Sequence, residues 1–383
     1  MPIPSVLAGP GMIKRFPEII KVCNVGRVLI VTDKSLMKMG LLDTFLDALR
    51  TNEIQFTIFD GVQPNPTFEN IEDGLQIYHQ NNCGGIVAFG GGSSMDCAKI
   101  IGARATNKIS IEKMRGIFKL TKKLPPFFAI PTTAGTGSEA TIAAVITNSA
   151  NHEKFAINDP KLVPIATVLD PELTLGLPGF LTAHTGMDAL THAVEAYIGW
   201  YDTPFVREKA LNATKMIVDN LEKVYSDGTD VTLRQDMLVA SFDAGVAFTR
   251  AYVGYVHAIA HNLGGLYGVP HGFANAVILP HILEFSKDKI EKKLAELSVF
   301  SELGCVEESE SILANRFIDR IKEMNRNMEI PKTIDALNSK DIPLLAERIL
   351  KEGNPTYPVP KIMDYDDCCS ILEDLVTPIN YHA

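Results

Sequence analysis

The segment GIVAFGGGSSMDCAKIIGARAT (residues 85–106) carries the clearest information about the fold class of this chain. It begins as a short apolar run typical of a buried strand, passes through Gly90, Gly91 and Gly92, and continues as a helical pattern. Glycines let a phosphate approach the backbone closely, and the N–H groups and positive dipole at the start of a helix favour an anion. A strand, a glycine turn and a helix in this order therefore predict a pyrophosphate site on an α/β fold.

Strands and helices alternate on both sides of this segment. We expect strands at residues 27–32, 55–60, 85–90 and 127–133, and further strands at 143–148 and 165–170. We expect helices between them at residues 35–51, 68–81 and 93–106. This alternation indicates βαβ units, and hence a Rossmann-like α/β domain whose parallel sheet has helices on both faces.

The pattern changes after Pro171, because long helical periodicity replaces the alternation. Helices are expected at residues 188–198, 205–225, 233–252, 256–266, 287–303 and 309–327. A chain of 383 residues also fits two or three domains of about 150 residues each. We therefore predict a dinucleotide-binding α/β domain at residues 1–178 and an all-helical domain at 179–383, with ligands in the cleft between them.

Composition excludes several classes of protein. The net charge is −10 and no segment gathers five basic residues, so no nucleic-acid partner is expected. The N-terminal residues lack the apolar core of a signal peptide, and nowhere do 18 apolar residues run together, so neither export nor membrane insertion is expected. The 6 cysteines include no CxxC pair, which suits reduced thiols in the cytoplasm.

Two further features point to a dinucleotide. Residues 135–140, GTGSEA, match the pattern GxGxxG/A, and their neighbouring hydroxyls make a polar loop, so both glycine loops can contact one cofactor from different strands. Asp33 follows the first predicted strand, where a carboxylate can bind an adenosine ribose and repel a 2′-phosphate, which favours NAD over NADP. A helix N-cap explains Asp33 equally well.

One aspartate and four histidines form a group in the second half of the chain, in which two pairs stand at helical spacing. Asp188 and His192 are four residues apart, His257 and His261 repeat that spacing, and His271 follows closely. Residues four apart project from the same face of a helix. A carboxylate combined with imidazoles suits Zn²⁺ or Fe²⁺, so the group predicts a divalent metal site, although any single histidine of it is more often structural.

Four segments resemble the signature blocks of the iron-containing, group III alcohol dehydrogenases. They are GGGSSMDCAK (90–99), TTAGTGSEAT (132–141), TGMDALTHAVEAY (185–197) and HAIAHNLGGLYGVPHGFANAVILP (257–280). The segment DGVQPNPT (60–67) extends the resemblance to nearly the whole chain. The resemblance implies an Fe²⁺ ion, with Zn²⁺ as the alternative, bound by Asp188, His192, His257 and His271. It further implies that His261 takes part in catalysis or proton transfer rather than in coordination.

The resemblance also implies contacts with the cofactor NAD(H) and with the substrate. Gly91, Gly92 and Ser93 would hold the pyrophosphate, and Asp33 would meet the adenosine ribose. Further cofactor contacts would come from Asn65, Thr132, Thr133, Thr136 and Lys154, and the substrate pocket would include Phe248 and Val253. Similar proteins act on small primary alcohols and aldehydes, and they form dimers or larger assemblies, so a homo-oligomer is expected.

The expected function is thus NAD(H)-dependent interconversion of a small primary alcohol and its aldehyde. Two other enzymes remain alternatives. A Zn-dependent polyol dehydrogenase of the glycerol type would use three protein ligands, whereas this chain offers four. A lyase similar to dehydroquinate synthase would need Lys and Arg near the metal, and the segments 185–197 and 257–280 contain none.

Overall fold

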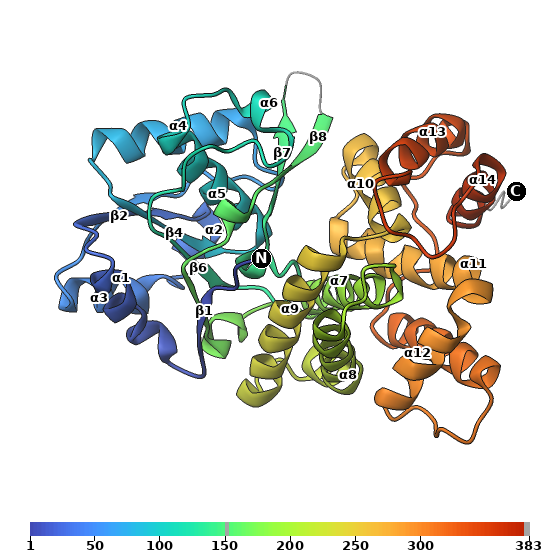
Figure 1. Ribbon diagram of the computed structural model, residues 1–383. Coiled ribbons are helices and arrows are strands. Elements are labelled where there is room, and N and C mark those ends of the chain that lie inside the picture. Colours follow the sequence, from blue (N-terminus) through green and yellow to red (C-terminus); the bar gives the residue numbers. More distant parts are fainter. Residues whose placement is uncertain (150–152, 379–383) are drawn as a thin grey trace, which may run out of the picture. The chain divides into compact units, whose positions relative to one another are not determined.

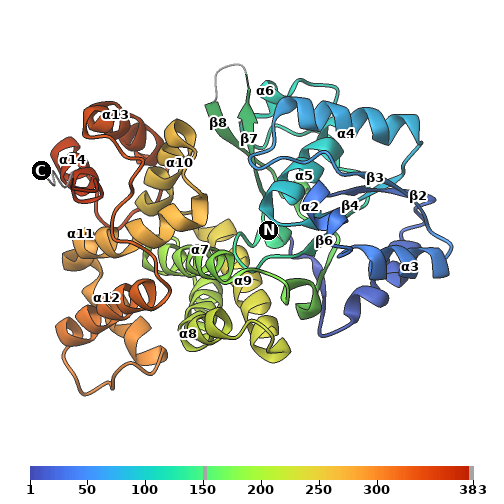
Figure 2. The same ribbon diagram turned by 180° about the vertical axis from the view of Figure 1, so that it is seen from behind.

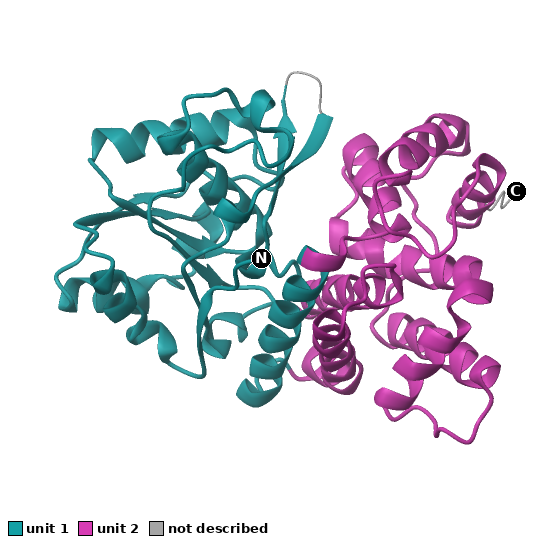
Figure 3. Ribbon diagram, viewed as in Figure 1, with its two compact units in different colours: residues 1–177, 228–249 teal, residues 178–227, 250–383 magenta. Residues whose placement is uncertain are grey.

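The computed structural model describes residues 1–149 and 153–378. It divides the chain into two compact units, Met1–Leu177 with Gly228–Thr249, and Pro178–Asp227 with Arg250–Ala383 (Figure 3). Within the described part of the chain, no helix is both long enough and apolar enough to cross a membrane.

A six-stranded parallel sheet forms the centre of the first unit, which confirms the predicted fold class (Figure 1). Its strands, in spatial order, are β1 (Ser5–Ala8), β9 (Ala166–Leu169), β6 (Phe127–Pro131), β4 (Gly85–Gly90), β2 (Arg27–Val31) and β3 (Gln55–Phe59). Strand β4 pairs with β2 on one side and with β6 on the other. Because the strands are parallel, the loops that follow β2, β4 and β6 leave the sheet at the same edge.

Helices cover both faces of this sheet, as alternate side chains of each strand require (Figures 1 and 2). In β2, Leu29 and Val31 join a core with α4 (Phe68–Gln80) and α5 (Gly92–Thr106). The alternate residues Val28 and Ile30 join a second core on the opposite face. That core includes α1 (Phe16–Val22) and α3 (Asp43–Thr51), which the short helices η1 (Met12–Lys14) and α2 (Lys34–Lys38) precede.

A small second sheet extends the first unit. It contains β5 (Gly116–Ile117), β8 (Glu153–Asn158) and β7 (Ala143–Asn148), and β7 pairs antiparallel with β8. The strand expected at residues 143–148 therefore exists but lies outside the parallel sheet. The remaining short elements of this part of the chain are α6 (Ile111–Met114), η2 (Ser138–Ala140), η3 (Pro160–Leu162) and η4 (Pro171–Thr174).

Helix α9 (Val231–Ala251) packs with the first unit as far as Thr249, although helices surround it in the sequence. A contact between two glycines permits this packing. A Cβ atom placed on Gly137, whose φ is +57°, would lie 2.7 Å from the Ser241 carbonyl oxygen and 2.8 Å from Gly245 Cα. Only glycine lets the loop after β6 approach the backbone of α9 so closely.

The second unit is helical, as the sequence predicts. Its helices are α7 (Gly179–Ile198), α8 (Pro204–Ser226), α10 (Tyr255–Tyr267), α11 (His271–Phe300), α12 (Glu310–Asn327), η5 (Ser339–Asp341), α13 (Ile342–Gly353) and α14 (Tyr365–Asp374). Helix α7 packs against both α8 and α11, and every residue from Gly186 to Ile198 is buried. The segment that carries Asp188 and His192 is thus the most enclosed part of this unit.

Candidate active site

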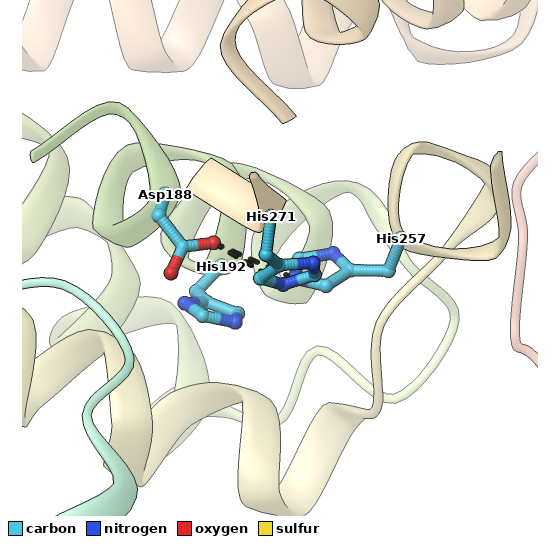
Figure 4. A group of neighbouring side chains, drawn as sticks. All are labelled: Asp188, His192, His257 and His271. Atoms are coloured by element: carbon cyan, nitrogen blue, oxygen red, sulfur yellow. Dashed lines mark ion pairs between the residues drawn. The ribbon is translucent and has the colours of Figure 1, made fainter. Parts of the chain in front are cut away.

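Four side chains from three helices of the second unit meet at one point (Figure 4). Asp188 and His192 project from successive turns of α7, His257 lies in the first turn of α10, and His271 is the first residue of α11. One nitrogen or oxygen of each lies within 4.8 Å of the corresponding atoms of the others. In particular, Asp188 Oδ1 is 3.5 Å from His271 Nε2 and 4.0 Å from His257 Nε2.

The burial of these side chains is typical of a metal site that is enclosed by protein but accessible to a small molecule on one side. The side chains of Asp188 and His257 are 3% and 2% exposed, whereas that of His271 is 38% exposed, so the group is open on one side. Burial and the neighbouring imidazoles of His192 and His271 hold the pKa of His257 well below its usual value. His257 is therefore neutral and keeps a lone pair for a metal.

The side-chain amide of Asn275, one turn after His271, contacts acceptor atoms of Asp188, His257 and His271, so the lone pairs of these three residues point toward a common region. Its amide nitrogen lies 2.6 Å from Asp188 Oδ1, 3.3 Å from His257 Nε2 and 3.2 Å from His271 Nε2. Its amide oxygen is buried and has no hydrogen-bond partner among the described residues. A donor shared by three acceptors and an unsatisfied buried oxygen both fit a site built for a cation.

Glu195 contacts His257 at Nδ1, the ring nitrogen that does not face Asp188. Its carboxylate lies 2.6 Å from His257 Nδ1 and accepts hydrogen bonds of 2.8 Å from the backbone N–H groups of Gly254 and Val256. A histidine that ligates a metal commonly donates its second N–H to a carboxylate, which fixes the tautomer and raises the basicity of the ligand. The same carboxylate satisfies N–H groups at the start of α10.

His261 lies beside the four residues rather than among them. Its ring stacks on that of His271, with centroids 5.3 Å apart and an interplanar angle of 13°, and its centroid is 5.9 Å from that of His257. Its Nδ1 lies 2.7 Å from Oε1 of Glu352, on α13. This position suits a role in proton transfer, as the resemblance implies.

In the first unit, the two glycine loops lie against each other at the edge where β4 and β6 end. A Cβ atom on Gly92 would lie 2.8 Å from Thr136 Cγ2, and one on Gly91 would lie 3.3 Å from Thr133 Oγ1. The Thr132 N–H donates to the Gly90 carbonyl oxygen at 3.1 Å. The structure thus brings together Gly91, Gly92, Ser93, Thr132, Thr133 and Thr136. Because Gly91 caps α5, backbone N–H groups are available there for a phosphate.

Lys99 links helix α5 to residues 138–143, which follow the second glycine loop. Its fully buried ammonium donates to five oxygens of Ser138, Thr141 and Ala143, at 2.7 to 3.1 Å. Asp96, on the same helix, accepts from the Ser138 hydroxyl at 2.9 Å. Sequence reasoning missed Lys99, although a lysine within an otherwise apolar stretch of helix is a signal of a buried, paired charge.

The other expected cofactor contacts also lie in the first unit. Asp33 follows β2, and its Oδ1 accepts from the N–H groups of Ser35 and Leu36 at 2.8 and 3.1 Å, so it caps α2. The helix-cap role is therefore present in the structure, and the ribose contact stays a prediction. Lys154 Nζ donates to Asn65 Oδ1 at 2.9 Å, so the structure brings these two residues together.

The two expected pocket residues lie in different units. Phe248 is on the last turns of α9 in the first unit, and Val253 precedes α10 in the second unit. Val253 lines a small cavity beside Glu195, together with Ile198 and Ile282. Both pocket assignments stay predictions.

Comparison with known proteins places the chain in a family. Residues 4–171 match the family model of iron-containing alcohol dehydrogenase, and residues 182–376 match that of the C-terminal part of the Fe-containing alcohol dehydrogenase family. The chain is 42% identical over 357 residues to 1,3-propanediol dehydrogenase of Citrobacter freundii, with 92% of each chain covered. It is 35% identical over 373 residues to NAD-dependent methanol dehydrogenase of Bacillus methanolicus, with 97% of this chain and 98% of the relative covered.

A solved structure gives the same assignment. The fold resembles that of a 1,3-propanediol oxidoreductase with a TM-score of 0.94 and 38% identity, over 97% of this chain and 98% of the other. The sequence matches span both units, and the matched residues 182–376 include Asp188, His192, His257 and His271. The chain belongs to the iron-containing alcohol dehydrogenase family.

Proposed function

We propose that this protein interconverts a small primary alcohol and its aldehyde, with NAD(H) as the hydride carrier and a divalent metal ion in the second unit. The observation that carries the proposal is the convergence of one carboxylate and three imidazoles within 4.8 Å, with one side of the group exposed. Membership of the alcohol dehydrogenase family supports the reaction type. Relatives named for propanediol and methanol support a small substrate.

The first unit would bind the dinucleotide. Gly91, Gly92 and Ser93, at the start of α5, present backbone N–H groups and a positive helix end to the pyrophosphate. The threonines of the loop after β6 would add hydroxyl contacts. Asp33 would accept from the ribose hydroxyls through Oδ2, because Oδ1 already caps α2.

The second unit would hold the metal and exchange the proton. Asp188, His192, His257 and His271 would be its ligands. When bound, a divalent ion supplies Lewis acidity toward the hydroxyl or carbonyl oxygen of the substrate. His261, next to this group, would accept the hydroxyl proton during oxidation of the alcohol and return it during reduction of the aldehyde.

We propose Fe²⁺ as the native ion, on the strength of the family. Three imidazoles and one carboxylate bind Zn²⁺ at least as well by intrinsic affinity, so the supply of metal in the cell would select between them. An Fe²⁺ enzyme would lose activity in air, and a Zn²⁺ enzyme would not.

Anaerobically purified protein provides the test. We expect about one metal ion per chain by elemental analysis, and oxidation of NADH but little NADPH with short aldehydes. His271→Ala should lose the metal and the activity, whereas His79→Ala, a histidine outside the site, should keep both. A wild-type protein that binds metal and NAD but reduces none of the aldehydes would contradict the proposal. The homo-oligomer and the cytoplasmic location stay predictions.

A further inference from the structure

A hydrogen-bond network surrounds Glu352, outside the four expected metal ligands. Glu352 Oε1 lies 2.7 Å from His261 Nδ1 and accepts from the Tyr357 hydroxyl at 2.8 Å. Glu352 Oε2 accepts from the Asn262 amide nitrogen at 3.0 Å. Both carboxylate oxygens are therefore held by partners, and one partner is the imidazole next to the metal-ligand group.

The ionisation of the Glu352 carboxylate determines which ring nitrogen of His261 carries the proton. Burial alone would raise the pKa of Glu352, but the neighbouring His261 and the hydrogen bonds from His261, Tyr357 and Asn262 outweigh burial and lower it. An ionised carboxylate only accepts hydrogen bonds, so the Nδ1 of His261 must donate. In neutral His261 the proton is then on Nδ1, and Nε2 carries the lone pair.

The network also fixes the direction of the ring. His261 is on α10 and Glu352 is on α13, so the hydrogen bond joins two helices that pack together. The face of the His261 ring stacks on His271, 13° from parallel, and the hydrogen bond to Glu352 holds the ring at its Nδ1 edge. A histidine that acts as a catalytic base must have the correct tautomer and the correct ring orientation, because its lone pair can accept a proton only when it points toward that proton.

We propose that Glu352 is a positioning residue of the dehydrogenase reaction, which holds His261 as the Nδ1–H tautomer so that Nε2 exchanges the proton with the substrate. This inference rests on the proposed function. During oxidation of the alcohol, His261 Nε2 would take the O–H proton, directly or through one water, and bound NAD⁺ would supply the hydride acceptor. The imidazolium that forms lies next to the Glu352 carboxylate, which stabilises its charge until the proton reaches solvent. Reduction of the aldehyde follows the reverse course.

Two substitutions separate orientation from charge. In metal-loaded full-length enzyme, Glu352→Gln keeps an oxygen that can accept from Nδ1 but removes the charge, and we expect kcat to fall about tenfold. Glu352→Ala removes both, and we expect a fall of about 100-fold with little change in KM. Metal content by elemental analysis should equal that of the wild type in both variants, which separates the effect from loss of the ion.

The structure offers a matched control for helix packing. The Tyr267 hydroxyl, also on α10, donates to Asp341 Oδ2, at the start of α13, at 2.7 Å. Tyr267→Phe removes the hydrogen bond from α10 to the residue that caps α13, and the one that the hydroxyl accepts from the Asn338 N–H, without touching His261, so kcat should stay within about twofold of the wild type. A fall as large as that of Glu352→Gln would assign both effects to packing and overturn the proposal.

A double-mutant cycle tests whether Glu352 acts through His261. In a His261→Asn background, Glu352→Gln should lower kcat by less than about twofold, because the group that it positions is already gone. An equal loss in both backgrounds, or no loss in the wild-type background, would overturn the proposal.

A second measurement does not depend on turnover. In Zn²⁺-loaded protein with ¹⁵N-labelled histidine, long-range ¹H–¹⁵N spectra report the tautomer of each ring, and the signals lost in His261→Asn identify His261. We expect the Nδ1–H pattern in the wild type and its loss in Glu352→Ala. An Nε2–H pattern in the wild type would overturn the proposal. A wild-type enzyme with the expected tautomer and no activity toward any alcohol or aldehyde would instead refute the proposed function.

Discussion

The substitution Glu195→Gln tests most directly whether the Glu195 carboxylate holds His257 in place for a metal. Glu195 is 2% exposed, and its two oxygens serve three donors, the N–H groups of Gly254, Val256 and His257. Glutamine has the same shape but only one acceptor oxygen. If that oxygen stays on Gly254 and His257, the amide NH₂ meets the Val256 N–H, and a buried donor without an acceptor costs about 1–3 kcal/mol. The opposite orientation would leave two donors without an acceptor.

The same change should weaken the binding of metal. Without the carboxylate charge behind it, His257 is a less basic and less firmly held ligand, and loss of such a partner typically lowers metal affinity about 10- to 100-fold. Burial raises the pKa of Glu195 to about 7, against the hydrogen bonds from Gly254 and Val256 that lower it. The comparison should therefore be made at about pH 8, where the wild-type carboxylate is ionised.

Two assays measure these effects. Competition with a chelator gives the Kd for the metal, and urea unfolding of the metal-free proteins gives the free energy of unfolding. Glu296→Gln is the control, because Glu296 also accepts a hydrogen bond, from the Tyr197 hydroxyl, but lies outside the ligand group. A Kd for Glu195→Gln within about threefold of the wild type would refute the reasoning that the carboxylate tunes His257.

Three further predictions concern the first unit. Lys99→Met leaves five oxygens, four of them buried, without their donor, so we expect a loss of about 3–5 kcal/mol in the free energy of unfolding, measured by urea denaturation. We also expect weaker binding of NAD by calorimetry, and unchanged NAD affinity would show that Lys99 does not organise the loop after β6 for the cofactor. Burial raises the pKa of Glu139 from 4.5 to about 7, so between these values the folded protein binds more protons than the unfolded chain and loses stability as the pH rises. The stability of Glu139→Gln relative to the wild type should therefore increase with pH through that window and level off above it, and a flat difference would contradict the pKa shift. Gly137→Ala would place a Cβ atom 2.7 Å from the Ser241 carbonyl oxygen at a residue whose φ is +57°, so it should lower the free energy of unfolding by about 2–5 kcal/mol. A thermal midpoint equal to that of the wild type would exclude this strain.

The parallel sheet was the most predictable part of the fold. Buried parallel strands are continuous apolar runs, and β2, β4 and β6 end within two residues of their expected bounds. The helix expected at residues 35–51 is instead split into α2 and α3, and between them Gly40 has a φ of +67°. Strand β8 was not expected, because its half-buried pattern beside β7 has no long apolar run to distinguish it from a loop.

The four expected metal ligands could be predicted from the sequence because their spacing along the chain is characteristic. Asp188 and His192 are four residues apart on α7, and His257 and His271 stand at the starts of the two later helices α10 and α11. Their partners depend on tertiary contacts instead. Glu352 is separated from His261 by 91 residues, and no local pattern connects them. Glu195 did leave a signal, since a single carboxylate among the apolar residues of HAVEAYI is rarely buried without a partner.

Under the proposed function, the position of the four expected ligands explains the presence of two carboxylates. His257 lies in the first turn of α10 and His271 begins α11, so the positive ends of two helices meet at the group. Positive helix ends oppose a cation, and a divalent ion there requires compensating negative charge. Asp188 supplies it within the ligand group, and Glu195 supplies it by accepting both from N–H groups at the start of α10 and from His257. One buried carboxylate thereby neutralises the helix end that would repel the metal and orients the imidazole that would bind it, so ligand geometry and charge balance depend on the same residue.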